Sequence, residues 1–418
     1  MSLLPQVLRS LPHDGWLLFI ARSARMFAYG FLAVVLALYL DRIGISAKGI
    51  GLLLTLTLVG DTAISLWLTT VADRFGRKKM LVVGAGLMLL AGGVFAATTN
   101  YPLLVLAATV GVISPSGNEV GPFLPIEQAS LTQLVGNKER TGVFAWYSLA
   151  GSVASAVGAI FGGGLAQGLI NAGWSPVASY RLLLVVYAGV GALLWVLFRR
   201  LTPAAESPRD ESAPAAAPSF LAARLGLHRS FHLVLKMSGL FALDAFGGGF
   251  IPQSIMAYWF YLRFGVEPGL LGSIFFVANL LAAVSALAAA RVAARIGLIR
   301  TMVFTHLPSN ILLILVPLMP NLPLAIAVLL LRFSISQMDV PTRQSYTMAV
   351  VSPDELSAAA GITGVARTTG AAISPIFTGI FLANAALWNV PFFLAGGLKI
   401  IYDLSLYRSL QAVKPPEE

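Results

Sequence analysis

Ten ionisable residues lie inside long apolar stretches of this 418-residue chain. An ionisable side chain at the centre of a membrane-spanning helix costs about 2.5–3.5 kcal/mol on insertion scales, so such residues are candidates for function. They are Arg22, Arg25, Asp61, Glu119, Glu127, Asp244, Arg332, Asp339, Arg343 and Arg367. Five are arginines and five are carboxylates, so their summed charge does not indicate the sign of a bound substrate.

The composition explains which elements must carry these residues. The chain is 57% hydrophobic and 11% charged, whereas soluble proteins carry about 25% charged residues. Apolar runs of eighteen residues or more recur, and each can cross a hydrocarbon core of about 30 Å. The net charge of +10 comes from cations in short loops, without a basic stripe interleaved with aromatic residues, so nucleic-acid binding is not expected. The sequence therefore predicts an all-α integral membrane protein in a lipid bilayer.

Twelve apolar stretches divide into two sets of six. We expect the helices at about 16–40, 49–72, 80–100, 102–135, 141–170, 180–198, 233–262, 269–294, 301–319, 322–351, 357–383 and 387–406. The segment 199–232 is polar and proline-rich, which is typical of a linker. The predicted domains are therefore bundles at 1–198 and 233–410, the linker between them, and a polar tail at 411–418. Most loop cations fall on one side, so we expect both termini in the cytoplasm.

The two halves repeat each other. Residues 39–44 align with 260–265, and in the same register 71–76 align with 292–297. Such a repeat predicts two pseudo-symmetric six-helix bundles.

Proline and glycine interrupt the fourth stretch between Ser114 and Gln128. We expect an unwound helix that places polar side chains around a water-filled cavity. Those side chains are Asn118, Glu119, Glu127 and Gln128. The alternative is a kink that only shapes the helix, with the two glutamates neutralised by Arg140 or by protons.

The tenth stretch mirrors the fourth and carries Asp339 and Arg343. Glu127 and Arg343 stand at nearly equivalent positions of the two halves, so they can form a gate across a cavity or a plain ion pair. Arg367 in the eleventh stretch is a further cation of the candidate substrate pathway.

Asp244 precedes three glycines, which make the seventh stretch bendable. It either carries a coupling proton or pairs permanently with Arg22 or Arg25. The two arginines can bind an anionic group, although we expect Arg22 to extend to lipid phosphates.

Two aromatic residues complete the candidate pathway. Tyr29 and Tyr147 can stack on an organic substrate or serve only in packing.

The hairpin 69–79 holds Asp73, Arg74, Gly76, Arg77 and Lys78 between two apolar stretches. It resembles the signature loop of the major facilitator superfamily, G-x-L-A-D-R-x-G-R-[KR], with Thr69 and Val71 in place of the glycine and leucine. The resemblance implies two six-helix bundles, transport by alternating access, and a conformational latch. We assign Asp61 and the five residues named above to that latch, and we expect a bacterial drug-efflux or organic-solute-efflux branch.

The predicted function is secondary transport of a small organic solute, coupled to protons and directed outward. An exporter of amphipathic or cationic compounds and an organic-anion porter that uses Arg25, Arg343 and Arg367 both stay open. A membrane sensor without transport is the alternative from another class. The chain has no cysteine, no nucleophile elbow and no phosphate-binding glycine loop, so we do not expect an enzyme.

Several expectations on partners and location accompany this function. His228 and His232 are four residues apart but have no third ligand nearby, so no metal is expected. We expect no cofactor other than the proton as coupling ion. The expected state is a multi-pass monomer in a bacterial inner membrane.

Overall fold

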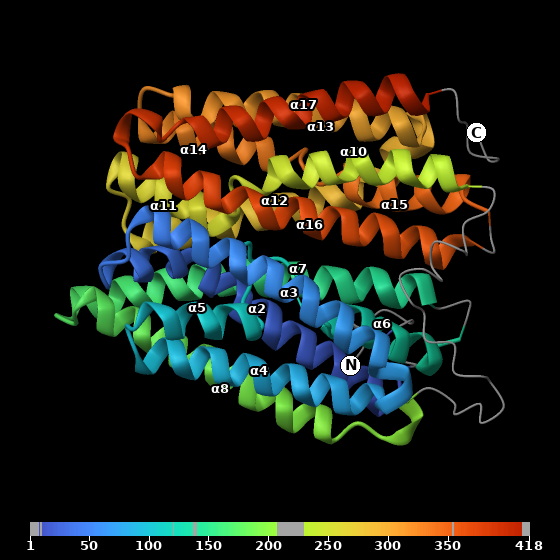
Figure 1. The fold of residues 1–418 in the computed structure, drawn as a ribbon, viewed down its shortest axis with the longest axis horizontal. Coiled ribbons are helices and arrows are strands. Elements are labelled where there is room, and N and C mark those ends of the chain that lie inside the picture. Colours follow the sequence, from blue (N-terminus) through green and yellow to red (C-terminus); the bar gives the residue numbers. More distant parts are fainter. Residues whose placement is uncertain are drawn as a thin grey trace. The chain divides into compact units, whose positions relative to one another are not determined.

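The computed structural model describes residues 8, 11–119, 121–136, 140–206, 230–352 and 355–411. The side chains of residues 70, 71, 73, 74, 141 and 356–358 are not part of this description. The described chain is built from helices, which Figure 1 follows from blue to red in chain order. This confirms the predicted all-α class.

Within the described residues, the first half holds seven α-helices and one short 3-10 helix. In order these are α2 (His13–Arg42), α3 (Ala47–Phe75), α4 (Arg77–Ala97), α5 (Tyr101–Val110), α6 (Phe123–Leu134), α7 (Arg140–Asn171), α8 (Pro176–Arg199) and η1 (Pro203–Ala205).

In the part of the second half that the structure describes, there are eight α-helices and two short 3-10 helices. They are α10 (Phe231–Gly249), α11 (Gln253–Phe264), α12 (Pro268–Ile296), α13 (Leu298–Leu315), η2 (Val316–Leu318), α14 (Leu322–Phe333), α15 (Asp339–Val350), α16 (Leu356–Leu382), η4 (Ala385–Leu387) and α17 (Val390–Leu410).

Ten helical stretches of the described chain are long and apolar enough to cross a membrane. Two shorter apolar helices, α5 and α14, each continue after a break into a second helix, α6 and α15. Counting each broken pair once gives the twelve crossings that the sequence predicted.

The break between α5 and α6 follows directly from local sequence. Gly117 and Gly121 take φ angles of +69° and +83°, which residues with a side chain rarely adopt. Pro115 and Pro122 lack the N–H that a continuous helix requires at these positions. The chain therefore runs without helix from 111 to 119 and resumes at Phe123.

Positive-φ glycines support the predicted repeat. Gly44 and Gly265 have φ angles of +88° and +65°, and Gly76 and Gly297 have +105° and +86°. Both pairs fall at the positions that the sequence register aligns. Gly76 and Gly297 also stand directly before α4 and α13, so the two halves turn their chains in the same way at matching points.

Contacts divide the chain into two compact units. The first holds residues 1–45, 59–214 and 260–276, and the second holds 46–58, 215–259 and 277–418. The main boundary falls inside the predicted linker 199–232, most of which lies outside the described residues. Each unit also takes a short segment from the other half of the chain, so the simpler division at the linker stays a prediction.

Helix α2 is the central element of the first unit. Residues 28–40 of this helix are almost completely buried, and it packs against α7 and α8. A helix that is apolar on all sides belongs inside a bundle. Its position brings the arginines of its first half into the interior.

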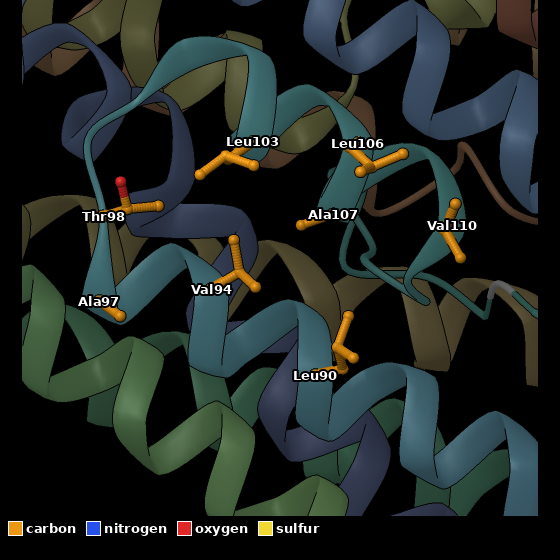
Figure 2. Close-up of a pocket in the computed structure, with 8 residues that line it drawn as sticks. All are labelled: Leu90, Val94, Ala97, Thr98, Leu103, Leu106, Ala107 and Val110. Carbon is orange, nitrogen blue, oxygen red and sulfur yellow. The ribbon is translucent and has the colours of Figure 1, made fainter.

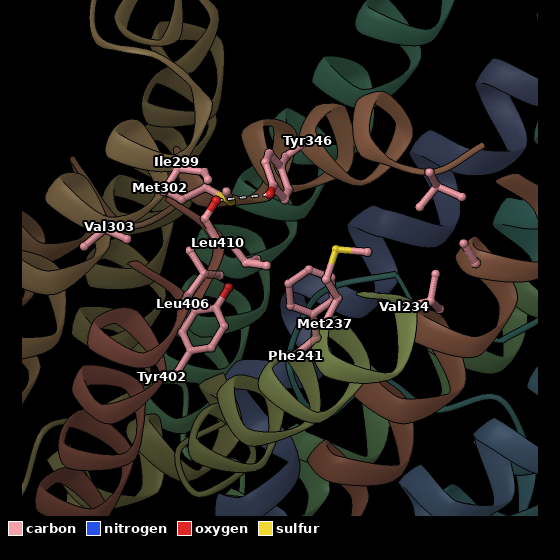
Figure 3. Close-up of a cluster of buried hydrophobic side chains, with 12 residues drawn as sticks. Val234, Met237, Phe241, Ile299, Met302, Val303, Tyr346, Tyr402, Leu406 and Leu410 are labelled. Carbon is pink, nitrogen blue, oxygen red and sulfur yellow. Dashed lines mark hydrogen bonds between the residues drawn. The ribbon is translucent and has the colours of Figure 1, made fainter. Parts of the chain in front are cut away.

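The second unit has an apolar core where α10, α13, α15 and α17 meet. Figure 3 shows Met237 and Phe241 of α10, Met302 of α13, Tyr346 of α15 and Tyr402 of α17 around this core. The hydroxyl of Tyr346 donates to the Leu410 carbonyl oxygen at 3.5 Å. These four helices also carry the polar residues described below.

Candidate functional site

Arg25 of α2 lies at the centre of a buried charge cluster in the first unit. Its side chain has no exposed surface, and its guanidinium binds two carboxylates. Nε and Nη2 donate to Glu119 Oε1 at 2.9 and 2.6 Å. Nη1 and Nη2 donate to Oε1 and Oε2 of Glu127 at 2.6 and 2.8 Å. The second pair is bidentate, a geometry in which arginine binds a carboxylate strongly.

Tyr147 and Arg22 complete this cluster. The Tyr147 hydroxyl donates to Glu127 Oε2 at 2.6 Å. Arg22 Nη2 lies 3.4 Å from Glu119 Oε2, and its guanidinium lies 4.4 Å from the centre of the Tyr147 ring. We call Arg22, Arg25, Glu119, Glu127 and Tyr147 the N-terminal charge cluster. Its two guanidinium groups balance its two carboxylates, as buried charges require.

Besides α2, which carries both arginines, three elements position the cluster. The break after α5 carries Glu119, helix α6 carries Glu127, and α7 supplies Tyr147. Ser155 of α7 donates to the Gly117 carbonyl oxygen at 2.9 Å and so attaches the unwound segment to that helix. The broken helix thus places Glu119 and Glu127 together, whereas the predicted water-filled cavity lined by Asn118, Glu119, Glu127 and Gln128 stays a prediction.

The expectation that Arg22 extends to lipid phosphates is wrong for this structure. The residue is only 7% exposed and points at Glu119. Gly151 makes this possible, because a Cβ atom there would lie 2.7 Å from Arg22 Nε. Arg22 Nε and Nη1 and Glu119 Oε2 are buried without a hydrogen bond to any described residue.

Asn118 and Gln128 lie beside the cluster with uncommitted side chains. Asn118 is exposed and Gln128 is half-buried. Within the described ranges, neither amide group forms a hydrogen bond to another residue. Both amides are therefore free to contact a polar solute.

Tyr29 and Asp61 are placed differently from the sequence interpretation. Tyr29 is fully buried, and its ring centre lies 6.4 Å from that of Tyr187, so it cannot stack on a solute in this conformation. Asp61 stands twelve residues before Asp73 on α3, about 18 Å along the helix axis. It lies within electrostatic range of Glu119. The structure thus separates Asp61 from the signature loop.

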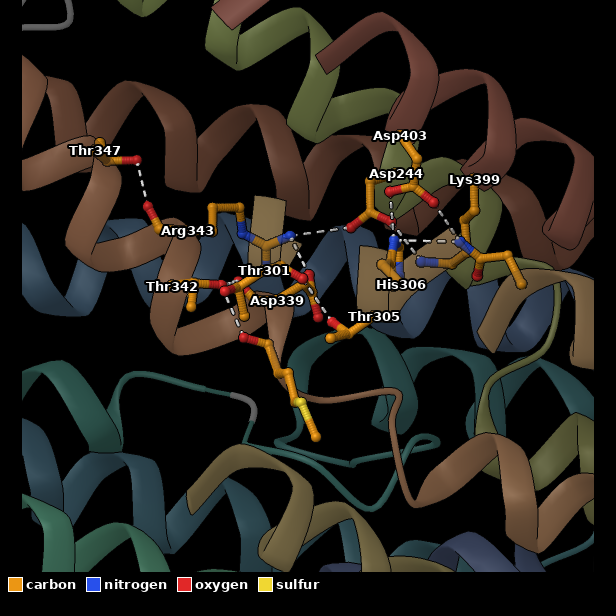
Figure 4. Close-up of polar contacts among 12 residues, drawn as sticks. Asp244, Thr301, Thr305, His306, Asp339, Thr342, Arg343, Thr347, Lys399 and Asp403 are labelled. Carbon is orange, nitrogen blue, oxygen red and sulfur yellow. Dashed lines mark hydrogen bonds and ion pairs between the residues drawn. The ribbon is translucent and has the colours of Figure 1, made fainter. Parts of the chain in front are cut away.

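Asp244 is the centre of a second charge network, in the second unit (Figure 4). Lys399 Nζ donates to Asp244 Oδ1 at 2.5 Å. Arg343 Nη1 donates to Asp244 Oδ2 at 3.2 Å and to Asp339 Oδ2 at 3.0 Å. The three predicted residues Asp244, Asp339 and Arg343 therefore come together, with Lys399 as a fourth member.

His306 of α13 extends this network to Asp403, a second residue of α17. His306 Nδ1 lies 2.8 Å from Asp403 Oδ1, and Nε2 lies 3.9 Å from Asp244 Oδ1. Asn310 Nδ2 donates to Asp403 Oδ2 at 2.9 Å. We call Asp244, His306, Asn310, Asp339, Arg343, Lys399 and Asp403 the C-terminal charge network.

Helical spacing and small residues build the network. His306 and Asn310 are four residues apart on α13, as are Lys399 and Asp403 on α17, so each pair shares a helix face. Cβ atoms added at Gly247 and Gly248 would lie 3.2 Å from Lys399 Cγ and 3.5 Å from its Nζ. Because Gly247 and Gly248 carry no side chain, they leave room for the Lys399 side chain to reach Asp244.

Lys399, His306 and Asp403 were missed by sequence reasoning. All three lie inside the predicted stretches 301–319 and 387–406, so the rule that selected the other ionisable residues also applies to them. The proposed pairing of Asp244 with Arg22 or Arg25 is wrong, since Asp244 binds Arg343 and Lys399.

The predicted gate between Glu127 and Arg343 is not required to balance either charge. Glu127 binds Arg25 and Tyr147, and Arg343 binds Asp244 and Asp339. Each residue thus finds its partners inside its own unit.

Two further arginines of the second unit were candidates. Arg367 of α16 is half-buried and interacts electrostatically with Arg343 and Asp244. It makes no hydrogen bond or ion pair with any described residue. Arg332 lies over the Phe333 ring, 5.0 Å from its centre. Because Arg367 has no ion-pair partner among the described residues, its charge is available to an incoming anion.

The signature loop is attached to the end of the first half. Glu206 accepts hydrogen bonds from the backbone N–H groups of Arg77 and Lys78 at 2.7 and 3.2 Å. Lys78 Nζ donates to the Leu201 carbonyl oxygen at 2.6 Å. A carboxylate at the N-terminus of α4 also complements the helix dipole.

The structure describes only some of the remaining latch residues. Gly76 takes its positive φ angle at the turn. The side chains of Asp73 and Arg74 lie outside the described residues, so the latch itself stays a prediction.

An apolar groove lies between α4 and α5 (Figure 2). It has a volume of about 450 Å³ and is lined by Leu90, Val94, Ala97, Thr98, Leu103, Leu106, Ala107 and Val110. Leu90 and Leu106 are more than half exposed, as expected for side chains that face lipid. The groove offers almost no polar group, so it is not the candidate site.

No group of three or more histidine, cysteine or acidic side chains that could hold a metal ion occurs in the described part of the chain.

The comparisons with known proteins agree with this architecture. The model of the Major Facilitator Superfamily matches residues 18–338. "Uncharacterized membrane protein YJR124C" of Saccharomyces cerevisiae is 33% identical, over 94% of this chain and 93% of that protein.

Solved structures show the same fold at low sequence identity. The D-xylose-proton symporter is 15% identical with a TM-score of 0.74, covering 94% of this chain and 97% of its own. The nucleoside transporter NupG is 12% identical with a TM-score of 0.73, covering 95% and 99%. The human organic anion transporter MFSD10 (TETRAN) is 16% identical with a TM-score of 0.65, covering 96% and 100%. On the match of the family model and the yeast relative, the chain belongs to the major facilitator superfamily, and it is a multi-pass membrane transporter rather than an enzyme.

Proposed function

We propose that this protein is a secondary transporter that moves a small organic solute by alternating access and couples this movement to protons. The observation that carries the proposal is the N-terminal charge cluster, which joins two buried arginines and two glutamates at the break of a membrane helix. Irregular backbone at membrane depth is tolerated where it lines a cavity, and transporters of this kind bind their solutes at such breaks.

The free polar groups support a solute site beside the cluster. Asn118 and Gln128 have uncommitted amides, and the Glu119 side chain retains 14% of its exposure. Arg25, in contrast, has its guanidinium occupied by two carboxylates. The solute is therefore expected to contact Asn118, Gln128 and Glu119 first.

Glu119 is the best of the three predicted proton carriers. Glu127 is held by Arg25 and Tyr147, and Asp244 is held by Lys399 and Arg343. Glu119 Oε2 instead has no hydrogen bond to a described residue. Its contact with Arg22 Nη2 is a long ion pair of 3.4 Å, so a proton that binds Oε2 displaces no hydrogen bond.

The finer features of the function follow from resemblance. We propose outward transport, as in the efflux branches that the signature loop resembles. We also propose that both termini lie in the cytoplasm and that the protein acts as a monomer. The bacterial inner membrane is part of the same proposal, although the curated relative named above is from yeast.

A second candidate function is an organic-anion porter. Its support is Arg367, a half-buried cation without an ion-pair partner among the described residues. MFSD10, one of the structural neighbours, is titled an organic anion transporter. Anion binding would then occur beside Arg343 and Arg367 in the second unit.

The test is a thermal-shift screen followed by counterflow. Purified full-length protein is melted with uridine, D-xylose, p-aminohippurate and tetraphenylphosphonium, since a solute that binds only the folded state raises the melting temperature. Solutes that respond are then assayed for counterflow in proteoliposomes. Absence of counterflow for every solute that binds would reject transport and favour a membrane sensor.

Two variants separate the candidate functions. Glu119→Gln is expected to reduce accumulation driven by a pH gradient at least tenfold, whereas Arg367→Gln is expected to weaken p-aminohippurate binding only if the anion hypothesis holds. Arg291→Gln removes an exposed cation of the second unit and serves as the matched control. Proton coupling would be rejected if the accumulation of solute by the unaltered protein did not depend on the pH gradient.

A further inference from the structure

The C-terminal charge network has an unequal number of fixed charges. Its carboxylates are Asp244, Asp339 and Asp403, while its permanent cations are Arg343 and Lys399. All of these side chains are at most 11% exposed. Arg367 and Arg332 act on these carboxylates only at a distance, without an ion pair to a described residue. Among the groups in direct contact the network therefore has one positive charge too few, and an uncompensated charge is costly in such surroundings.

His306 is placed to supply that charge. With Asp403 ionised, Nδ1 carries a hydrogen and donates it to Asp403 Oδ1 at 2.8 Å, and Nε2 faces Asp244 Oδ1 at 3.9 Å. Asn310 Nδ2 lies 3.2 Å from the same Nδ1. A proton on Nε2 would place an imidazolium between two carboxylates, in contact with one and in reach of the other. Asn310 keeps Asp403 in this orientation by donating to its other oxygen.

The groups around His306 come from four helices. Asp244 of α10, Asp339 of α15, and Lys399 and Asp403 of α17 act on it electrostatically. Arg343 of α15 and Arg367 of α16 act on the same carboxylates. The uncharged neighbours are Asn310 and the Tyr402 ring, whose centre lies 6.0 Å from that of the imidazole.

Lys399 and His306 share a single oxygen atom. Lys399 Nζ donates to Asp244 Oδ1, and His306 Nε2 approaches the same atom. When Nε2 binds a proton, the positive imidazolium can neutralise part of the negative charge of Asp244. Lys399 is then held less tightly by Asp244.

We propose that His306 and Asp403 form a proton-binding site in the second unit, at which a proton bound to Nε2 completes the charge balance of the closed network. This inference rests on the proposed proton-coupled transport and adds a second site to Glu119. The bound proton leaves when the network opens and Asp244 moves away from His306.

The direct test is nuclear magnetic resonance of the full-length protein in lipid nanodiscs with ¹⁵N-labelled histidine. The chain has four histidines, and the His306 signal is the one missing from His306→Gln. We expect two protonated ring nitrogens on His306 at pH 7 and a single one in Asp403→Asn. A His306 ring with an unprotonated Nε2 at pH 7 would overturn the inference, whatever the outcome of the counterflow assay.

The functional test compares two transport modes of the panel solute that shows counterflow. In His306→Gln we expect accumulation driven by a pH gradient to fall at least tenfold, with counterflow reduced less than threefold. His232→Gln, at an exposed position in the first turn of α10, is expected to match the unaltered protein in both modes. Equal losses in both modes of His306→Gln would indicate a structural role and reject the proton site.

The variant Glu119→Gln distinguishes the proposed transport function from the proposed proton site at His306. It is expected to lower gradient-driven accumulation without changing the His306 signal. If the His306 signal shows the second ring proton but no solute is transported, the proton site stands and the proposed function fails.

Discussion

The two charge clusters use similar residues in different ways. In the N-terminal charge cluster, one fully buried arginine, Arg25, holds both carboxylates. In the C-terminal charge network, one carboxylate, Asp244, is shared by Lys399, Arg343 and the approaching His306. The first arrangement depends mainly on Arg25, since Arg22 contacts Glu119 only at 3.4 Å, whereas in the second Asp244 keeps a cation when one of its contacts is lost. A site with one central residue is sensitive to its loss, and a site with shared contacts can exchange partners during a transport cycle.

Arg25→Met is expected to have the largest effect. It leaves Glu119 and Glu127 buried without their main partner, and removing one member of a buried ion pair costs about 3–5 kcal/mol. The apparent melting temperature of the purified protein should fall strongly. Arg42→Met, at the exposed end of α2, is the control, and equal melting of the two variants would show that Arg25 is not central.

Lys399→Met should be less damaging, because Asp244 keeps Arg343. A lost hydrogen bond to a charged group costs about 1.5–3 kcal/mol. The melting temperature should therefore fall, but by less than in Arg25→Met. Adding Asp244→Asn to Lys399→Met should recover part of this loss, since it removes the excess negative charge. A loss as large as that of Arg25→Met would contradict the idea that contacts in the second unit are shared.

Tyr147→Phe removes one donor from Glu127 and keeps the ring under Arg22. Because the bidentate contact of Arg25 with Glu127 is retained, we expect a cost near the lower end of the same range, about 1.5 kcal/mol. Tyr407→Phe, on a half-buried residue of α17, is the matched control. The same melting temperature for both variants would mean that the Tyr147 hydroxyl does not support the cluster.

A pair of glycine substitutions should show the smallest difference between the clusters. Gly151→Ala places a Cβ 2.7 Å from Arg22 Nε, whereas Gly248→Ala meets Lys399 only at 3.5 Å. Alanine is favoured over glycine in a helix by about 1 kcal/mol, so Gly248→Ala should be neutral or stabilising. Gly151→Ala should melt lower than Gly248→Ala, and the reverse order would show that Arg22 can move aside without cost.

Much of the fold could be predicted because membrane insertion leaves a direct signal in the sequence. Long apolar stretches, the charged hairpin 69–79 and the proline and glycine residues between 115 and 122 correspond to helices, to a turn at Gly76 and to the break before α6. The charged members Arg25, Glu119, Asp244 and Arg343 were identified by the same rule, since an ionisable group in an apolar stretch is unexpected without a role.

The sequence by itself determined that these residues lie in the membrane, because hydropathy and turn residues act over short distances along the chain. Only the tertiary structure decided which charges pair. Arg25 and Glu127 are separated by 102 residues, and Lys399 and Asp244 by 155. Such contacts depend on how helices pack, which in turn depends on small residues such as Gly151 and Gly247 that let a long side chain pass. For this reason Arg22 was expected at the lipid surface but lies in the interior, and the partners of His306, Asp244 and Asp403, were decided only by the packing of α10, α13 and α17.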